Sequence, residues 1–398
     1  MMASTAAQAS QADQPTARDR EPTAAHAGPV AADTGPVAAH AGPVAADAER
    51  VAADYELLST GAGLLDRSQR GRLALTGAGA AEFLNGQVTN EIAALRPGTG
   101  CYAAFLTHKG KMLGDLRVLA AGGTPGGAQT DVEPTAKAQA GGAQTDSETT
   151  ELLLETERVA LQGLFDMIRR FKIGYDVELH KRTLETSLIS LIGPRARAVA
   201  AGAVDAAQRE ALPPAEEHAH RATRIANRPA RLIATAAPEG MDVLCESGDR
   251  DAIEAALIAA GARPAGEIAA EIVRVEHGRP RYGIELDESV IPQEAGLNER
   301  AVDFTKGCYV GQETVARLYY KGKPNRHLRG LRLAEPVPAG AELRLGDRVL
   351  GTLASSVRSP ALGPIALALV RREAQPGATL AAGPDGVAAT VVELPFAR

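Results

Sequence analysis

The chain has 398 residues, 45% of them hydrophobic, and a formal net charge of −6. This length predicts two or three domains, and the negative charge argues against broad electrostatic wrapping of nucleic acid. The 3 cysteines lie far apart and form no C-x-x-C pair, which excludes a four-cysteine zinc or iron–sulfur site within one chain. We expect a cytoplasmic protein, since the sequence has no long apolar run and no secretory or transit pattern.

Residues 1–54 form a tract rich in Ala, Pro, Gly and Asp. A seven-residue repeat begins at Gly28, Gly35 and Gly42, and each copy contains a Gly-Pro pair that forbids continuous helix. Large apolar residues are too few to offset the entropy of ordering. We therefore predict a disordered low-complexity extension, with ordered sequence from about Tyr55.

The first ordered elements predicted are a strand at 72–75 and a short helix over 79–84. Two further strand-like segments, 115–119 and 152–155, flank a second low-complexity run at 121–149. Because surface loops tolerate added length at small entropic cost, we interpret this run as a flexible insertion in a hairpin connection.

An amphipathic pattern then predicts a helix from Thr156, as its N-cap, to Phe171, with Val159 on the buried face. We expect a strand at 187–192 and a second helix at 249–260.

From Leu328 onward the pattern changes to short strands separated by Gly and Pro, which indicates a small closed β-barrel. The expected strands are 328–333, 342–345, 349–355, 365–370 and 388–394. The preceding part mixes strands and helices without regular alternation, so the α+β class fits best. We divide the chain into the extension 1–54, α+β domains over 55–270, a signature segment 271–326 and the barrel 327–398.

The most informative segment runs from Lys306 to Glu313, with the sequence Lys-Gly-Cys-Tyr-Val-Gly-Gln-Glu. If the residues after Gly311 form a helix, Cys308 lies ahead of its positive end and beside Lys306, and both features favour a reactive thiolate. The alternative is a Gly-rich turn with a small buried cysteine, since free Cys is among the most buried residue types.

Three other stretches carry polar groups that could bind a ligand. Residues 105–115 contain a Lys-Gly-Lys turn followed by Asp115, residues 274–294 pack charges of both signs between glycines, and 315–332 is basic and contains two tyrosines. Each stretch could instead have no ligand-binding role. In the same order, the three would then be an exposed hairpin turn, a solvated loop and a solvated linker. His277 has no second histidine at ligand spacing, so we propose no metal site.

Together these segments resemble the YgfZ-type folate-binding proteins, which belong to the superfamily of the glycine-cleavage aminomethyltransferase (T-protein). Residues 306–313 match the complete K-G-C-[YF]-x-G-Q-E signature. Residues 83–90, 108–115 and 274–294 resemble the family's flanking segments in the same order. The resemblance covers roughly 57–395.

The resemblance implies a three-domain ring around a central channel that holds tetrahydrofolate or a folate derivative. It also implies an accessory role in the assembly or repair of iron–sulfur clusters, with cluster enzymes (among them a tRNA-modifying one) or assembly proteins as clients. We expect a monomer without membrane or direct nucleic-acid binding. The site residues implied are Cys308 and Lys306 as the functional centre, and Asp115, Lys109, Glu285, Tyr309, Gln312, Glu313 and Arg317 around the folate.

Within that set, Asp115 and Glu285 are expected at the ring nitrogens, and Lys109 or Arg317 at the carboxylates of the folate tail. One departure separates the chain from the transferase branch, whose hairpin strand is expected to carry the pattern Gly-Gly-x-x-Asp-Asp. In this chain Gly114-Asp115 keeps only the second of the two acids. The alternative function is a tetrahydrofolate-dependent aminomethyltransferase or demethylase. An RNA-binding module that uses 315–332 is a third possibility, which the net charge disfavours.

Overall fold

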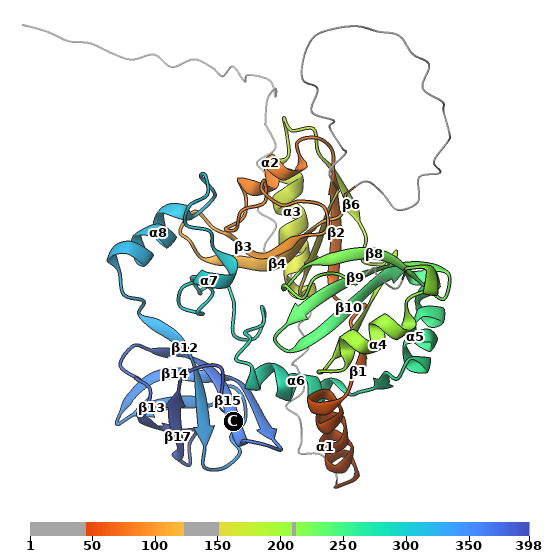
Figure 1. Ribbon diagram of the computed structural model, residues 1–398. Helices are drawn as coiled ribbons and strands as arrows, with labels where there is room; N and C mark the ends of the chain where they lie inside the picture. Colours follow the sequence, from red (N-terminus) through yellow and green to blue (C-terminus); the bar gives the residue numbers. More distant parts are fainter. Residues whose placement is uncertain (1–44, 123–150, 209–211, 398) are drawn as a thin grey trace, which may run out of the picture. The chain divides into compact units, whose positions relative to one another are not determined.

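The computed structural model describes residues 45–122, 151–208 and 212–397 (Figure 1). Within these ranges the strands form a five-stranded sheet, a six-stranded sheet and a closed six-stranded barrel. Helices pack on the two sheets without regular alternation with the strands. The predicted α+β class with a small C-terminal β-barrel is therefore confirmed. No helix in the described ranges combines the length and apolar character needed to cross a membrane.

The five-stranded sheet has the order β3-β4-β5-β2-β6, with antiparallel neighbours throughout. Its strands are β2 (Gly71–Thr76), β3 (Gly100–Leu106), β4 (Met112–Ala120), β5 (Leu152–Thr156) and β6 (Glu178–Lys181). Helices α2 (Ala80–Asn85) and α3 (Leu161–Phe171) contribute Phe83 and Leu164 to the same buried apolar cluster as Leu116 of β4. This apolar core stabilises the sheet and fixes the positions of the polar residues of β4.

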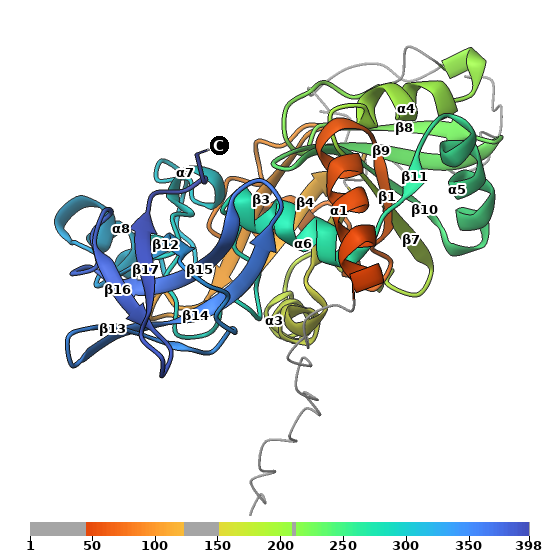
Figure 2. The ribbon, with the colours of Figure 1, turned by 90° about the horizontal axis from the view of Figure 1, so that it is seen from below.

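The six-stranded sheet has the order β11-β1-β7-β10-β9-β8. Its strands are β1 (Gly63–Asp66), β7 (Thr186–Ile192), β8 (His220–Ile225), β9 (Arg228–Ala236), β10 (Glu239–Glu246) and β11 (Arg263–Pro264). Helices α4 (Ala196–Ala203) and α5 (Arg250–Ala259) pack on it through one apolar cluster that includes Val199, Leu232 and Leu257. Helices α1 (Ala45–Thr60) and α6 (Glu267–Glu276) lie side by side and form a second cluster with Leu65 and Ile192 of the sheet (Figure 2). Short 3-10 helices occupy Arg158–Ala160, Ala206–Gln208 and Ser247–Asp249.

The barrel closes through β12-β15-β14-β13-β16-β17, with β17 bonded back to β12. Its strands are β12 (Arg326–Leu333), β13 (Glu342–Leu345), β14 (Arg348–Ser359), β15 (Gly363–Arg371), β16 (Thr379–Ala382) and β17 (Val387–Val392). Five of these strands are the predicted ones. The sequence pattern missed β16, which has only four residues and the weak strand formers Ala381 and Ala382.

The end of β14 connects the barrel to the preceding helices. The hydroxyl groups of Ser359 and Tyr55 both donate to the carboxylate of Glu276, with Tyr55 Oη at 2.9 Å from Oε1. All three residues are buried. One carboxylate therefore joins α1, α6 and the barrel.

Two short helices lie next to the Lys306–Glu313 motif, namely α7 (Asn298–Ala301) before it and α8 (Gln312–Lys321), which begins within it. From here on, the signature segment means residues 306–313. Residues after Gly311 are therefore helical, as the first of the two alternatives required. Gly311 has a φ of +86°, and a Cβ at this position would lie 2.6 Å from the carbonyl oxygen of Thr107. Only glycine fits this close approach of α8 to the Lys-Gly-Lys turn.

The predicted helix over 156–171 was wrong in its first turn. Thr156 ends β5, and its hydroxyl donates to the carbonyl of Asp115 in place of capping a helix. The α-helix begins only at Leu161, so Val159, which we expected to be buried, is 60% exposed. Strand pairing with β2, in which Thr156 lies opposite Gly71, outcompetes the local helix signal here, because it provides partners for the backbone polar groups.

The segment predicted as a disordered extension lies outside the described residues up to position 44, but its last ten positions belong to α1. The helix forms because Val51, Tyr55 and Leu58 pack against α6. Most of the predicted insertion also lies outside the described residues. Strands β4 and β5, on either side of it, pair antiparallel as a hairpin connection requires. The domain boundaries themselves stay predictions.

Candidate functional site

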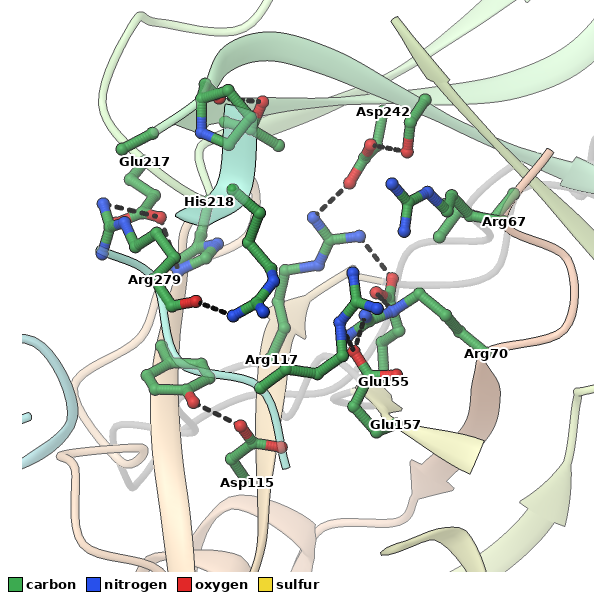
Figure 3. A pocket seen from close by; sticks show the side chains of 18 of the residues that line it. Arg67, Arg70, Asp115, Arg117, Glu155, Glu157, Glu217, His218, Asp242 and Arg279 are labelled. Carbon is green, nitrogen blue, oxygen red and sulfur yellow. Dashed lines mark hydrogen bonds and ion pairs between the residues drawn. The ribbon is translucent and has the colours of Figure 1, made fainter. Parts of the chain in front are cut away.

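A cavity of about 220 Å³ lies between the five-stranded and six-stranded sheets (Figure 3). Asp115 and Arg117 of β4 and Glu155 of β5 line one side, and Asp242 of β10 lines the other. Residues 279–281, which follow α6, also contribute. Arginines outnumber carboxylates among the lining residues, and apolar side chains lie between them, so the cavity suits a ring with several hydrogen-bonding groups.

Strand register explains the charged wall of the cavity. Arg117 lies directly opposite Glu155 in the β4–β5 pair, and its guanidinium group bonds to that carboxylate and, at 2.6 Å, to Asp242 Oδ2. Ser190, opposite Asp242 on β7, donates to Asp242 Oδ1 at 2.6 Å. Arg70 Nε donates to Glu155 Oε1 at 2.6 Å. One buried network thus joins the two sheets across the back of the cavity.

The same network controls the charge of Glu155. Burial alone would raise the pKa of this carboxyl, but the guanidinium groups of Arg117 and Arg70 outweigh burial and hold the pKa well below its usual range. Glu155 therefore stays ionised at neutral pH and acts as a fixed counter-charge.

Asp115 has a different environment within the same cavity. It is only 6% exposed, and burial raises the pKa of its carboxyl, while the hydrogen bond from the hydroxyl group of Tyr102 opposes that shift. The guanidinium group of Arg300 lies 4.1 Å from the centre of the Tyr102 ring. A carboxyl with a raised pKa beside an ionised one is the arrangement in which a single site can both hold and release a proton.

The other predicted residues lie in two further places. Glu285 is buried behind the cavity, where it bonds to Arg274 at 3.0 Å and accepts a hydrogen bond from Ser355 of the barrel. Arg274 itself lines the cavity, so Glu285 positions that guanidinium group from behind. Lys109 is exposed at the Lys-Gly-Lys turn and is not a lining residue.

Lys306 is anchored by the backbone of the 85–90 loop. Its Nζ donates to the carbonyl oxygens of Asn85, Val88 and Asn90 at 2.6–2.8 Å. Burial lowers the pKa of Lys306 to about 8, but three carbonyl acceptors match the three hydrogens of the ammonium form. This lysine points away from the cavity and fixes the start of the signature segment.

The rest of the signature segment separates into a buried and an exposed part. Tyr309 is buried, with its ring centre 5.2 Å from Lys306 Nζ. Cys308 is exposed, Gln312 is half-buried, and Glu313 pairs with Arg317 at 2.7 Å on the exposed face of α8. None of these residues lines the cavity. Of the predicted site residues the structure therefore places Asp115 in the cavity, and the roles assigned to the others stay predictions.

Several lining residues were not anticipated from the sequence. Arg117 had a usable signal, since alternation along a strand places it on the same face as Asp115. Tyr102 lies opposite Arg117 in the β3–β4 pair, diagonal to Asp115, which required the register. Arg300 and His218 come from segments with no distinctive pattern, and only the fold brings them to the cavity.

Comparisons with known proteins agree with this architecture. Residues 30–124 and 143–306 match the GCVT N-terminal domain, and residues 326–397 match the glycine cleavage T-protein C-terminal barrel domain. The chain is 31% identical to an aminomethyltransferase of Streptomyces avermitilis over 355 residues, covering 85% of this chain and 87% of the relative. It is 26% identical to an aminomethyltransferase of Corynebacterium aurimucosum over 330 residues, covering 80% and 82%.

A solved structure is also similar. The glycine cleavage system aminomethyltransferase T from Bartonella henselae superposes with a TM-score of 0.70 at 22% identity, over 87% of this chain and 89% of that chain. At this identity the likeness establishes a shared fold.

Proposed function

This chain belongs to the glycine cleavage T-protein (GCVT) family, and on that premise we propose that its cavity binds tetrahydrofolate for the transfer of a one-carbon unit. The observation that carries the proposal is Asp115, a buried carboxyl with a raised pKa that faces a polar cavity lined by arginines. The aminomethyltransferase names of its relatives support the same reaction class.

The residues present fit a folate in chemistry and in size. A cavity of 220 Å³ is smaller than the roughly 300–1,000 Å³ typical of drug-sized ligands, so it suits one ring system and leaves a tail outside. Asp115 and Tyr102 offer an acceptor and a hydroxyl to a ring rich in N–H groups. Arginines such as Arg279 and Arg281 match the anionic tail.

Bound tetrahydrofolate would supply a ring nitrogen as the acceptor of the one-carbon unit. Asp115 would exchange a proton with the ligand, because burial raises the pKa of its carboxyl. Ionised Glu155 would balance the positive charge of Arg70 and Arg117. Glu285 would hold the guanidinium group of Arg274 in place, and Arg274 would orient the ligand. The single acid at 114–115 predicts slower transfer than a paired arrangement would give.

The test is transfer of the one-carbon unit of an aminomethyl donor to tetrahydrofolate, with release of ammonia, by the purified full chain. We expect Asp115→Asn to lower the rate by about 10²–10⁴-fold, the usual effect of losing a positioned acid or base. Asp251→Asn is the matched control, since that carboxylate is 95% exposed on α5. Transfer at the wild-type rate by Asp115→Asn would remove Asp115 from the reaction. Absence of tetrahydrofolate binding by the wild type would contradict the proposal as a whole.

A second candidate is the YgfZ-type accessory role in iron–sulfur cluster assembly or repair. The observation that favours it is Cys308, which is exposed in the loop that precedes α8 and does not line the cavity, so that a partner protein could reach the thiol. On this proposal Cys308→Ala leaves folate binding and folding intact but fails to restore cluster-enzyme activity in cells that lack the protein. Full restoration by Cys308→Ala would refute a thiol role, and Cys308→Ser tests whether the sulfur itself is needed.

A further inference from the structure

His218 has a backbone conformation that is uncommon for residues other than glycine. Its φ is +71°, in the left-handed region. The strand pair fixes it there, because its N–H donates to the carbonyl of Ala234 at 2.9 Å and the next residue but one, His220, is bonded to Gly98 at 2.8 Å. Strained positions that the surrounding structure over-determines concentrate at functional sites.

The side chain of His218 is buried in the wall of the cavity and lacks hydrogen-bond partners. It is 7% exposed, and in the described part of the chain neither ring nitrogen finds a donor or an acceptor (Figure 3). The nearest carboxylate, Glu217 Oε1, lies 3.9 Å from Nε2, beyond hydrogen-bond distance. Buried polar atoms are almost always paired, so an imidazole at a cavity wall without a partner in the protein is available to bond a ligand that enters the cavity.

His220 makes the contrast clear. It is also buried, but its Nε2 lies 3.1 Å from the carbonyl of Thr99 and its Nδ1 lies 2.9 Å from Arg231 Nη1. It does not line the cavity. Two neighbouring histidines thus differ in one respect, namely that the structure satisfies one and leaves the other open toward the cavity.

The charge state of His218 fits a hydrogen-bonding role better than an ionic one. Burial, together with the nearby guanidinium groups of Arg117 and Arg300, lowers its pKa to about 3, although the carboxylates of Glu217 and Glu155 act in the other direction. The imidazole is therefore neutral at physiological pH and presents one N–H donor and one nitrogen acceptor.

The surroundings of His218 connect it to Asp115. Glu217, its neighbour in sequence, pairs with Arg300 at 2.8 Å. Arg300 in turn covers the ring of Tyr102, whose hydroxyl donates to Asp115. His218 and Asp115 therefore belong to one continuous set of contacts in the lining of the same cavity.

We propose that His218 contacts the bound ligand directly, with its neutral imidazole bonded to an edge of a polar heterocyclic ring that presents an N–H donor and a carbonyl or nitrogen acceptor. The inference rests on the proposed function, because it names a further contact to the ring of tetrahydrofolate. It assigns His218 to the ring and not to the glutamate tail, since a buried neutral imidazole offers a donor and an acceptor but no positive charge to the carboxylates of the tail.

The experiment compares His218→Leu with His220→Leu in the full chain. The dissociation constants of tetrahydrofolate, of tetrahydropterin (the ring alone) and of p-aminobenzoylglutamate (the tail alone) are measured by calorimetry, and the Tm is measured without ligand. We expect His218→Leu to weaken tetrahydrofolate and tetrahydropterin by about tenfold, the effect of one lost hydrogen bond, without lowering the Tm. His220→Leu should do the reverse, lowering the Tm and leaving the three dissociation constants unchanged.

Several results would overturn the inference. One is an unchanged affinity of His218→Leu for tetrahydropterin. Another is an effect confined to p-aminobenzoylglutamate. A third is a loss of affinity in His218→Leu that comes with a lower Tm. If His218→Leu does not fold, the NMR signals of the His218 imidazole in the wild type decide, since direct contact requires them to shift on addition of tetrahydropterin. A wild type that binds no tetrahydrofolate would refute the proposed function itself, whereas wild-type binding with an indifferent His218 would refute only this inference.

Discussion

Replacement of Arg117 by leucine tests the network that joins the two sheets. The side chains of Arg117, Glu155 and Asp242 are 8%, 11% and 11% exposed, so Arg117→Leu leaves two carboxylates buried with fewer partners. Removing one partner of a buried ion pair destabilises a protein by about 3–5 kcal/mol. Because Arg70 still bonds to Glu155 and Ser190 to Asp242, we expect the lower end, about 3 kcal/mol.

The pH dependence of this loss identifies its cause. The pKa of Glu155 is depressed in the folded wild type, so its contribution to stability is complete above its unfolded pKa of about 4.3 and disappears as the pH falls further. In Arg117→Leu that contribution is smaller, and protonation of Glu155 relieves the buried charge. The difference in unfolding free energy between wild type and variant should therefore shrink between pH 7 and pH 3, with most of the change below the unfolded pKa of about 4.3.

Urea denaturation at the two pH values measures both quantities. Arg348→Leu is the control, because Arg348 and its partner Glu373 form an exposed pair on the barrel that should contribute at most about 1 kcal/mol. The double variant Arg117→Leu with Glu155→Leu should recover part of the loss, since it removes a stranded carboxylate. A loss at pH 7 no larger than that of Arg348→Leu, or a difference that does not shrink at pH 3, would refute this account of the network.

Two further predictions concern the signature segment. Lys306→Met should lower the unfolding free energy by roughly 2–4 kcal/mol, because three backbone carbonyls lose their donor, and urea denaturation checks this value. A loss below about 0.5 kcal/mol, the size of an ordinary surface substitution, would contradict the anchoring role. Gly311→Ala should lower the Tm further than Gly340→Ala, since both glycines have a φ of +86° but only a Cβ at 311 would meet a carbonyl oxygen. Equal shifts in the two variants would mean that the close approach to Thr107 contributes nothing.

Local signals predicted much of the secondary structure. Glycine and proline punctuation located five strands of the barrel, whereas the helix after Gly311 was only one of the possibilities left open. The failures arose where tertiary pairing overrode local preference. Thr156 has the chemistry of an N-cap but completes β5, and residues 45–54, which resemble disordered sequence, begin a helix that α6 stabilises.

The candidate site could be predicted only in part. Asp115 was accessible from the sequence because it stands beside a recognisable turn. Tyr102, His218 and Arg300 were not, because each contributes a single side chain from a segment without periodicity or a motif. The most conspicuous motif, Lys306 to Glu313, lies away from the cavity, and its lysine holds backbone carbonyls. Motif strength thus indicated the family, whereas strand register determined which side chains share a cavity.

The hydroxyl groups of β14 have a consequence for how the chain can be divided. Ser355 and Ser359 donate to Glu285 and Glu276, two carboxylates that belong to the segment before the barrel. A protein shortened to end before β12 would lose these donors and would also uncover Val275, which packs in one apolar cluster with Leu328 and Ile365 of the barrel. The barrel therefore covers buried acids of the preceding segment, and a chain without it should be less stable than the full chain.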